Sequence, residues 1–325
     1  MAHTPKTYNL AAVTGDITLK DGDTATGTLA GDYKVSIANG ATVTLSGVTI
    51  TSIPDDPSHK WAGINCPGDA TIVLASGTTN TVKGGDRMYP GIYIAPDKTL
   101  TIEGSGTLDA RSNGNYPDGA GIGGGYNIAC GNIVIKGGNI TAAGGRGAAG
   151  IGGGFKSSTG DASWGYITIS GGNITATGGQ ISTGTSGTIY GGAGIGSGGG
   201  TSYRCGQINI TGGTINATGG QNAAGIGGGS DSSCGGITIS GGTVDVYGGQ
   251  NAVAIGTGVR VTSNGAPFCG NINITNGVTR VTATKGTDSS STIGATSGGT
   301  RGKITIGGVE FEASITDSPY TYNPQ

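Results

Sequence analysis

The feature that most constrains the fold of this chain is a short phrase that returns along its length. The phrase places one isoleucine among small residues and reads GAGIGGG, AAGIGGG, GAGIGSG, AAGIGGG and, in a decayed form, AVAIGTG. Where no insertion intervenes, its isoleucines stand about 28 to 31 residues apart. Self-similarity at such a period indicates one structural unit stacked on copies of itself. The clear copies contain Ile122, Ile151, Ile195, Ile226 and Ile255, and weaker copies contain Ile64, Ile92 and Ile293.

Between these copies lie short runs of alternating apolar and polar residues, interrupted by glycine pairs, as in GYITISGG followed by NITATGG. Alternation with period two is typical of strands with one buried face, and no stretch shows the period of a helix. Equivalent positions keep their chemistry from repeat to repeat, which favours parallel strands stacked in register. Crossovers between parallel strands are right-handed in nearly all cases. We therefore predict an all-β fold, a right-handed parallel β-helix (β-solenoid) with three strands per coil and roughly eight to nine coils.

The alternation also assigns side chains to the inside of this solenoid. Isoleucine pairs are expected to form one interior wall, single isoleucines of the next strand a second wall, and the AGI segment a third. The residue between the two isoleucines of each pair is expected to face water. The first wall comprises Ile133, Ile135, Ile167, Ile169, Ile208, Ile210, Ile237, Ile239, Ile272, Ile274, Ile304 and Ile306, and the second Ile140, Ile174, Ile215 and Val244.

Composition alone would allow a low-complexity chain, because 72 of the 325 residues are glycine and only 11% are charged. Regular Ile, Val and Thr at strand spacing instead indicate an ordered core. We interpret residues 1–325 as a single domain. Residues 1–60 are expected to form an N-terminal cap and the first coils, residues 61–300 the repeat coils and residues 301–325 a C-terminal cap. No signal-peptide or transmembrane pattern is recognised, so we expect no membrane insertion.

The cysteines all follow the AGI segment, which predicts one register position on different coils. Cys205, Cys234 and Cys269 are expected on consecutive coils, near enough for a disulfide between either adjacent pair. A ladder of buried free thiols is the alternative. No CxxC spacing occurs, and His3 and His59 are the only histidines, so a zinc site is not expected. The five cysteines are Cys66, Cys130, Cys205, Cys234 and Cys269.

Some parallel β-helices cleave polysaccharides, and this chemistry needs clustered acidic side chains, often with calcium or a basic catalytic group. In a stacked fold such a cluster requires acids at one position of neighbouring coils. The predicted outward ladder holds two acids separated by three neutral residues, with an arginine beside the second acid. No paired carboxylates can be assembled, so we assign no catalytic residue and do not favour an enzyme. The ladder is Asp109, Thr141, Thr175, Asn216, Asp245 and Arg280.

The insertions between repeats hold most of the large aromatic residues and many of the charges. Variable loops on a rigid scaffold are where binding usually resides. Aromatic faces stack on sugar rings, and Asp, Asn and Arg can hydrogen-bond hydroxyl groups or, for the acids, hold an ion. The alternative is that these aromatics only cover the edges of coils. The candidate ligand-binding residues are Trp61, Asp86, Arg87, Tyr89, Tyr116, Asp118, Trp164, Tyr166, Tyr203 and Arg204.

The alternation of AGIGGG with a GxITIxGGTITATGG phrase resembles the Gly-rich repeats of large secreted or wall-attached proteins of Gram-positive, largely gut-dwelling bacteria, often labelled carbohydrate-binding domain proteins. The resemblance covers roughly residues 60–310. The chain is more loosely similar to a clostridial β-helix group that binds acidic plant polysaccharides with calcium. These resemblances imply an extracellular or cell-surface location and a polysaccharide or glycan partner, including glycan on a host glycoprotein. They imply no cofactor other than calcium, and calcium and its ligands stay open.

Three functional classes follow from the residues and the resemblance together. The favoured class is an extracellular non-catalytic binding module or adhesin that recognises carbohydrate through loops and an outward strand face. A structural spacer or host-protein-binding adhesin repeat is one alternative, and a polysaccharide lyase or hydrolase is another. A nucleic-acid partner is not expected, because the net charge is −2 and no basic stripe occurs.

Overall fold

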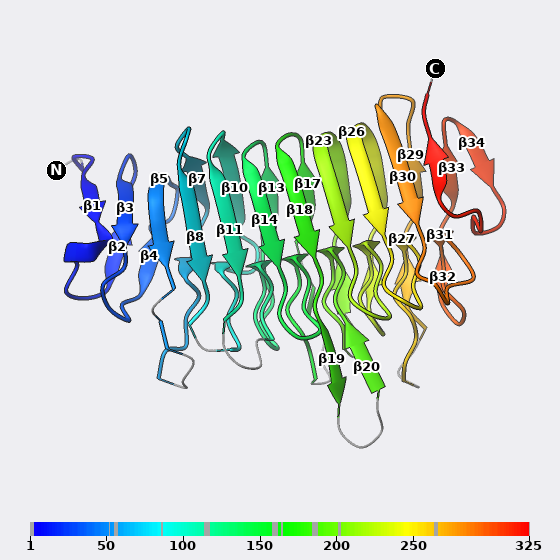
Figure 1. Ribbon diagram of the computed structural model, residues 1–325, viewed down its shortest axis with the longest axis horizontal. Coiled ribbons are helices and arrows are strands. Elements are labelled where there is room, and N and C mark those ends of the chain that lie inside the picture. The colour runs from blue at the N-terminus through cyan, green and yellow to red at the C-terminus, as the bar shows by residue number, and fades with distance from the viewer. Residues whose placement is uncertain are drawn as a thin grey trace.

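The computed structural model describes residues 3–51, 53–54, 58–85, 87–113, 118–157, 162–163, 165–183, 188–200, 203–262 and 266–324. In these residues the chain winds into a stack of strands, with the N-terminal strands at one end and the C-terminal strands at the other (Figure 1). Strands of successive windings pair in parallel. The predicted all-β parallel solenoid is therefore confirmed, whereas its handedness and its number of coils stay predictions.

The largest sheet has 18 strands and forms two walls of the stack. The two walls count as one sheet because long strands such as β23 bend from one wall into the other, pairing with β17 on the first and β18 on the second. Its strands are β1 (Thr7–Asn9), β3 (Thr24–Thr28), β5 (Ala41–Ile50), β7 (Ala70–Leu74), β8 (Thr79–Lys83), β10 (Thr99–Gly104), β11 (Thr107–Arg111), β13 (Asn132–Ile135), β14 (Asn139–Ala143), β17 (Ile167–Ile169), β18 (Asn173–Thr177), β23 (Ile208–Thr218), β26 (Ile237–Tyr247), β29 (Ile272–Ile274), β30 (Arg280–Thr284), β33 (Ile304–Ile306), β34 (Val309–Phe311) and β35 (Tyr320–Tyr322).

The AGI phrases build most of a second sheet, which has ten short strands and is the third predicted wall. Its first two strands come from the N-terminal residues 1–60, which lack the phrase. Each repeat isoleucine pairs with the next one along the stack, as Ile195 does with Ile226 and Ile226 with Ile255. The strands are β2 (Ile17–Leu19), β4 (Val35–Ile37), β6 (Ile64–Cys66), β9 (Ile92–Ile94), β12 (Ile122–Gly123), β15 (Ile151–Gly152), β21 (Ile195–Gly196), β24 (Ile226–Gly227), β27 (Ile255–Gly256) and β31 (Ile293–Gly294).

The later windings differ from the predicted three strands, because the segment between the AGI phrase and the isoleucine pair also forms strands. This five-stranded sheet consists of β16 (Ala162–Ser163), β22 (Tyr203–Cys205), β25 (Ser233–Cys234), β28 (Phe268–Cys269) and β32 (Thr300–Arg301). The remaining elements are the antiparallel hairpin of β19 (Gln180–Thr183) and β20 (Thr188–Gly191) and the short 3-10 helix η1 (Leu10–Ala12).

The cysteine prediction holds for part of the set. Cys205 pairs with Cys234, and Cys234 with Cys269, so these three share one register position. Cys66 is an exception, because it belongs to β6 of the AGI sheet, where it pairs with Ile94. All five cysteines are buried and free.

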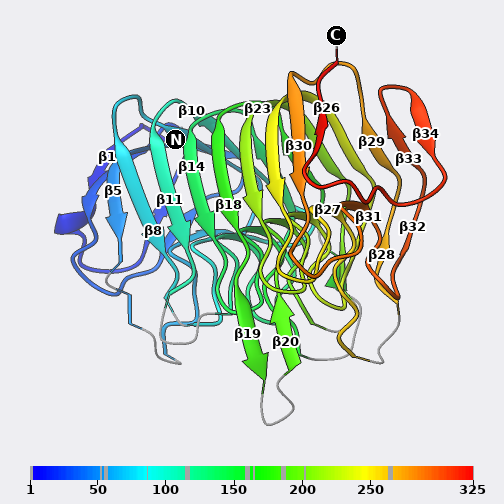
Figure 2. The ribbon, with the colours of Figure 1, turned by 45° about the vertical axis from the view of Figure 1, so that its right-hand side comes forward.

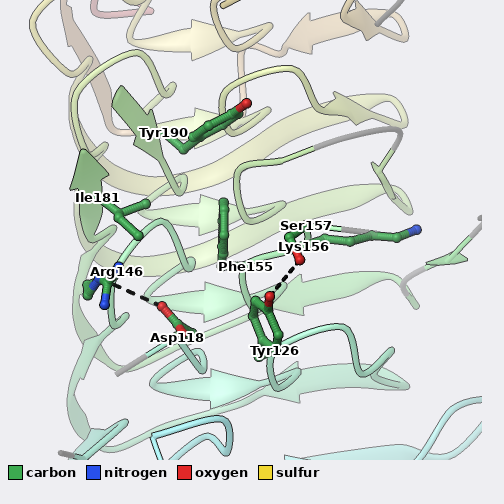
Figure 3. A pocket seen from close by; sticks show the side chains of 8 residues that line it. All are labelled: Asp118, Tyr126, Arg146, Phe155, Lys156, Ser157, Ile181 and Tyr190. Carbon is green, nitrogen blue, oxygen red and sulfur yellow. Dashed lines mark hydrogen bonds and ion pairs between the residues drawn. The ribbon is translucent and has the colours of Figure 1, made fainter. Parts of the chain in front are cut away.

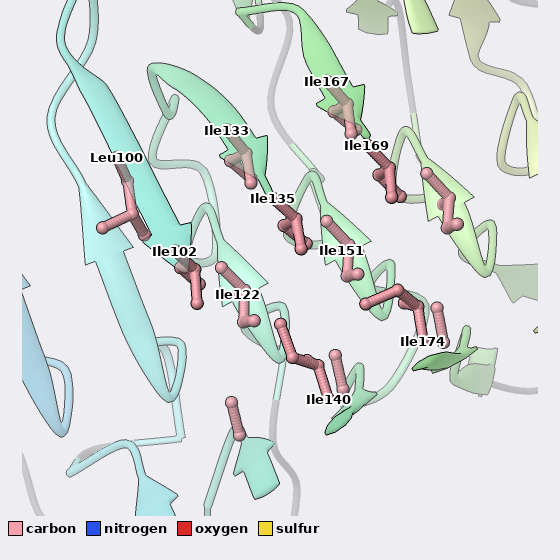
Figure 4. Close-up of a cluster of buried hydrophobic side chains, with 14 of the residues drawn as sticks. Leu100, Ile102, Ile122, Ile133, Ile135, Ile140, Ile151, Ile167, Ile169 and Ile174 are labelled. Atoms are coloured by element: carbon pink, nitrogen blue, oxygen red, sulfur yellow. The ribbon is translucent and has the colours of Figure 1, made fainter. Parts of the chain in front are cut away.

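The core is a set of isoleucine rows, as the alternation predicts. Ile133 pairs with Ile167 on the first wall and Ile140 with Ile174 on the second, and all four are at most 2% exposed. Figure 4 shows Ile151 of the third wall lying between Ile135 of the first wall and Ile174 of the second. Burying one isoleucine side chain contributes about 1.5–3 kcal/mol. Repeated along the stack, these rows account for a fold that contains few aromatic residues.

From Ile122 to Ile255, the glycine after each repeat isoleucine is required by close approach of neighbouring windings. Gly227 has φ +133°, a conformation that side-chain-bearing residues rarely adopt. A Cβ atom there would lie 2.1 Å from the carbonyl oxygen of Gly256 in the next winding. Glycine at this position therefore allows the AGI strands to stack.

The outward ladder differs from its prediction at one position. Asp109, Thr141, Thr175, Asn216 and Asp245 do stand in one row, but the residue paired with Asp245 is Thr282. Arg280 lies two residues earlier and pairs with Thr243. Its guanidinium still reaches the Asp245 carboxylate at 2.7 Å, so the expected ion pair forms across the ladder.

Both ends of the stack carry strands outside the repeat pattern. At the C-terminal end β34 pairs antiparallel with β33, and β35 pairs antiparallel with β30. Phe311, Tyr320 and Tyr322 pack, partly buried, against the core there. At the N-terminal end Leu10 of η1 is fully buried. No helix in the described part of the chain is long and apolar enough to cross a membrane.

Candidate functional site

The repeat is interrupted between Ile151 and Ile195, where the hairpin of β19 and β20 projects from the stack (Figures 1 and 2). The following winding holds the base of the hairpin in place. The side-chain amide of Asn222 donates to the carbonyl of Ile189 at 2.7 Å, and the Ser230 hydroxyl accepts from the N–H of Gly191 at 2.7 Å. The insertion is thus anchored on the scaffold.

Three aromatic rings form a row beside this hairpin. Tyr126 and Phe155 each stand four residues after a repeat isoleucine, so they occupy the same position on successive windings. Their ring centroids are 6.0 Å apart with an interplanar angle of 30°. Tyr190 of β20 follows Phe155 in the row, at 5.6 Å and 60°. The row therefore runs along the stack of windings.

The hairpin supplies the third ring because the next winding has none at that position. The residue four places after Ile195 is Gly199, which has no side chain to fill the space. Tyr190 contacts Phe155 in its stead and is itself half-buried. Burial raises the pKa of the Tyr190 hydroxyl, and the negative charge of Asp231 adds to the rise. The hydroxyl is therefore neutral at physiological pH and can donate a hydrogen bond.

Polar groups face the aromatic row from two sides. On one side the Asp118 carboxylate and the Arg146 guanidinium form an ion pair of 3.9 Å between Oδ1 and Nε. Asp118 is 9% exposed, so its carboxylate is largely shielded from solvent. On the other side the hydroxyl groups of Tyr126 and Ser157 are 2.5 Å apart.

Backbone hydrogen bonds between windings fix these side chains relative to one another. The N–H of Phe155 donates to the carbonyl of Asp118 at 2.9 Å, and the N–H of Asn127 donates to the carbonyl of Phe155 at 3.0 Å. The N–H of Asp118 donates in turn to the carbonyl of Arg87 at 2.7 Å. The side chains are thus held by the scaffold rather than by long loops.

Together these residues enclose an open cavity of about 360 Å³, called here the insertion pocket. In Figure 3 Arg146, Asp118 and Ile181 lie on one side of the Phe155 ring, and Lys156 extends away from the three rings. The pocket offers aromatic faces, a carboxylate that accepts, and guanidinium and hydroxyl groups that donate. It is lined by Asp118, Tyr126, Arg146, Phe155, Lys156, Ser157, Ile181 and Tyr190.

Of the ten residues predicted from the sequence to bind ligand, the structure places Asp118 in this pocket. Arg87 and Tyr89 belong to the adjoining segment, in which the carbonyl of Arg87 accepts from Asp118 and that of Tyr89 accepts from the Ser112 hydroxyl at 2.9 Å. Arg87 is exposed and Tyr89 is half-buried. Neither residue is among the side chains that line the pocket.

Three other candidates lie elsewhere. Trp61 is partly buried against the core, and its ring meets that of His59 edge-on at 5.0 Å. Tyr166 leads into β17 and is 41% exposed. Arg204 is an exposed residue of β22. The structure does not bring these side chains together in one site.

The remaining candidates cannot be placed. Asp86, Tyr116 and Trp164 lie outside the described residues. Tyr203 belongs to β22, and its side chain is likewise outside what the structure describes.

The aromatic row and Arg146 were not among the predicted residues, although the sequence carries a signal for both. Tyr126 and Phe155 replace the small residues found four places after the isoleucine in later repeats. Arg146 stands where the aligned phrases GGQN contain Gln221 and Gln250. Departures from a repeat at aligned positions would therefore have found three pocket residues. Tyr190 has no equivalent in the repeats, so alignment could not reveal it.

Among the described residues, no three His, Cys, Asp or Glu side chains lie close enough together to hold a metal ion. Asp118 is the one carboxylate among the described residues that line the pocket.

Comparison with known proteins identifies the repeats. A family model described as Beta helix repeat matches residues 100–126, 133–155, 208–230 and 237–259. No curated protein and no solved structure matches the chain significantly. The four matched segments are therefore β-helix repeats, and the hairpin lies in residues 156–207, between two of them.

Proposed function

We propose that this protein is a non-catalytic binding module or adhesin that recognises carbohydrate in the insertion pocket, outside a bacterial cell or on its surface. The observation that carries the proposal is the row of Tyr126, Phe155 and Tyr190 beside the Asp118–Arg146 pair. Sugar rings present apolar C–H faces and hydroxyl edges. Aromatic rings with a polar handle match the faces, and a few convergent polar groups match the edges.

A binding role is favoured over cleavage by the number of acids. Glycoside hydrolysis ordinarily uses two carboxyl groups flanking the bond that breaks. Asp118 is paired with Arg146. Among the described residues that line the pocket there is no second acid. One carboxylate next to a guanidinium suits the orientation of hydroxyl groups better than a two-acid reaction.

The ligand class follows from the same groups. Asp118 accepts hydrogen bonds from sugar hydroxyls, while Arg146 donates to hydroxyl oxygens or to the carboxylate of an acidic sugar. A polysaccharide, or the glycan of a host glycoprotein, offers these groups. Calcium is retained as an accessory ion to be tested, since carboxylate and carbonyl oxygens are its usual ligands.

A glycan array probed with the purified protein tests the proposal, run once with calcium and once with a chelator. Binding that is weakened by Phe155→Ala and produces no reducing sugar supports a binding module. Loss of the signal with chelator would add calcium to the site. Release of reducing sugar would overturn the non-catalytic proposal.

The alternative of a structural spacer makes the opposite prediction. A spacer needs only the stack of windings, so changes in the pocket would alter no interaction. If no glycan on the array binds, and pocket variants behave in the array as the wild type does, a spacer or an adhesin that binds host protein would be favoured.

A further inference from the structure

Three thiols stand in a row on consecutive strands β22, β25 and β28, away from the residues that line the pocket. Cys205, Cys234 and Cys269 are at most 2% exposed. Each pairs in register with the next, so their Cα atoms are about 4.8 Å apart, the spacing of neighbouring strands. That separation lies within the range of about 4.4–6.8 Å that a disulfide spans.

The side chains distinguish between the two adjacent pairs. The sulfur atoms of Cys234 and Cys269 are 2.9 Å apart, with the Cys234 thiol donating to Cys269. The Cys269 sulfur also contacts the carbonyl of Gly235 at 3.7 Å, which orients it toward the same winding. The sequence left Cys205–Cys234 and Cys234–Cys269 open, and the sulfur contact favours the second pair.

We propose that Cys234 and Cys269 are a modification site at which a low-molecular-weight disulfide, such as oxidised glutathione, forms an intrachain disulfide between two successive windings. A thiolate of one cysteine attacks the small disulfide, giving a mixed disulfide and one released thiol. The other cysteine then attacks the protein sulfur of the mixed disulfide, which forms the Cys234–Cys269 bond and releases a second thiol. The protein loses two electrons and two protons, and the small disulfide gains both as two thiols.

Burial decides when this reaction occurs. The hydrogen bond to Cys269 and burial hold the pKa of Cys234 well above its usual value, so Cys234 of the folded protein is hardly ever a thiolate. Both sulfur atoms are also buried away from a small disulfide in solution. Only the thiolate attacks a disulfide. The bond therefore forms while the windings assemble, or when they open, and the folded stack then shields it. Because it closes a loop of 35 residues, it restricts the unfolded chain and stabilises the fold.

Refolding the reduced, unfolded chain in a buffer of reduced and oxidised glutathione tests the proposal. We expect a product lighter by two hydrogen atoms, in which peptide mapping links Cys234 to Cys269 and finds Cys66, Cys130 and Cys205 reduced. The melting temperature of this product should lie several degrees above that of the same protein after reduction. The matched variant Cys205→Ser should form the same bond, and Cys269→Ser should form none.

Two outcomes would overturn the proposal. One is a correctly refolded chain that retains five free thiols. The other is a product in which Cys205 is joined to Cys234. The melting comparison uses the wild-type chain alone, so it remains informative even where a variant refolds poorly.

Discussion

The same scaffold has different roles in the regular windings of residues 192–259 and in the interrupted windings of residues 118–191. In the regular windings the fourth residue after the repeat isoleucine is Gly199, Ser230 or Val259. In the interrupted windings it is Tyr126 or Phe155, and the inserted hairpin adds Tyr190. Repetition commits alternate strand side chains to the core or to the outer face of the stack. An insertion leaves side chains free to converge on a ligand.

The largest expected effect concerns the stacking glycines of the regular windings. Gly227→Ala places a Cβ 2.1 Å from the Gly256 carbonyl oxygen in a backbone conformation that alanine avoids. We expect a loss of about 4 kcal/mol or more in the free energy of unfolding. Denaturant unfolding measures this loss.

A matched control separates crowding from backbone strain. Gly47 also has positive φ, +73°, but nothing lies within 4 Å of a Cβ built there. Gly47→Ala should therefore cost only about 1–2 kcal/mol. Equal losses for the two variants would show that close stacking does not constrain the regular windings.

The second effect concerns the aromatic row of the interrupted windings. Tyr190→Ala removes the ring that contacts Phe155 and should weaken glycan binding about tenfold or more. Titration calorimetry with a glycan identified by the array measures the change. Tyr247→Ala is the control, because Tyr247 is a tyrosine of the regular windings, 41% exposed on β26. Equal weakening by both variants would contradict a site at the hairpin.

A smaller effect on glycan binding is expected when Arg146 is replaced by the residue found at that position in the repeats. Arg146→Gln installs the residue that the aligned phrases carry as Gln221 and Gln250. The scaffold should tolerate it, with a change in the free energy of unfolding within about 0.5 kcal/mol. Glycan binding should weaken severalfold, because a charged donor near Asp118 is lost. Unchanged affinity would remove Arg146 from the proposed site.

The smallest effect is a pH dependence confined to the N-terminal end. Burial raises the pKa of Asp23, but hydrogen bonds from the Lys20 N–H, the His3 ring and the Lys6 N–H outweigh it, and the pKa is lowered overall. A carboxylate with a depressed pKa stabilises the fold above its unfolded value of 3.8 and loses this contribution as pH falls through the lower, folded value.

Acid should therefore loosen the N-terminal strands while leaving the regular windings folded. As the pH is lowered from about 5 to below 3.8, hydrogen-exchange protection should fall at Lys6 and Lys20 and persist at Ile226. Asp23→Asn should abolish most of this pH dependence. A parallel loss of protection at Ile226 would show that the two regions do not respond separately.

The difference between the regions also explains what could be predicted from the sequence. Residues at equivalent positions of the repeats have the same chemistry, so aligning the repeats predicts which residues are neighbours. The isoleucine rows, their register and the parallel stack could be predicted in this way, and Ile133 does pair with Ile167. The pocket consists of residues that are not repeated, and the hairpin brings them into contact. Asp118 was found because it is an acid in an insertion, but nothing local places Tyr190 against Phe155. Arg280 was misplaced by two residues because the segment before it varies in length.

Hydrogen exchange of the wild-type protein, with and without a glycan identified by the array, tests most directly where binding resides. We expect new protection confined to residues 118–127 and 145–157 and to the hairpin strands β19 and β20. Protection centred instead on β23 and β26 of the regular windings would contradict the claim that binding resides where the repeat is interrupted.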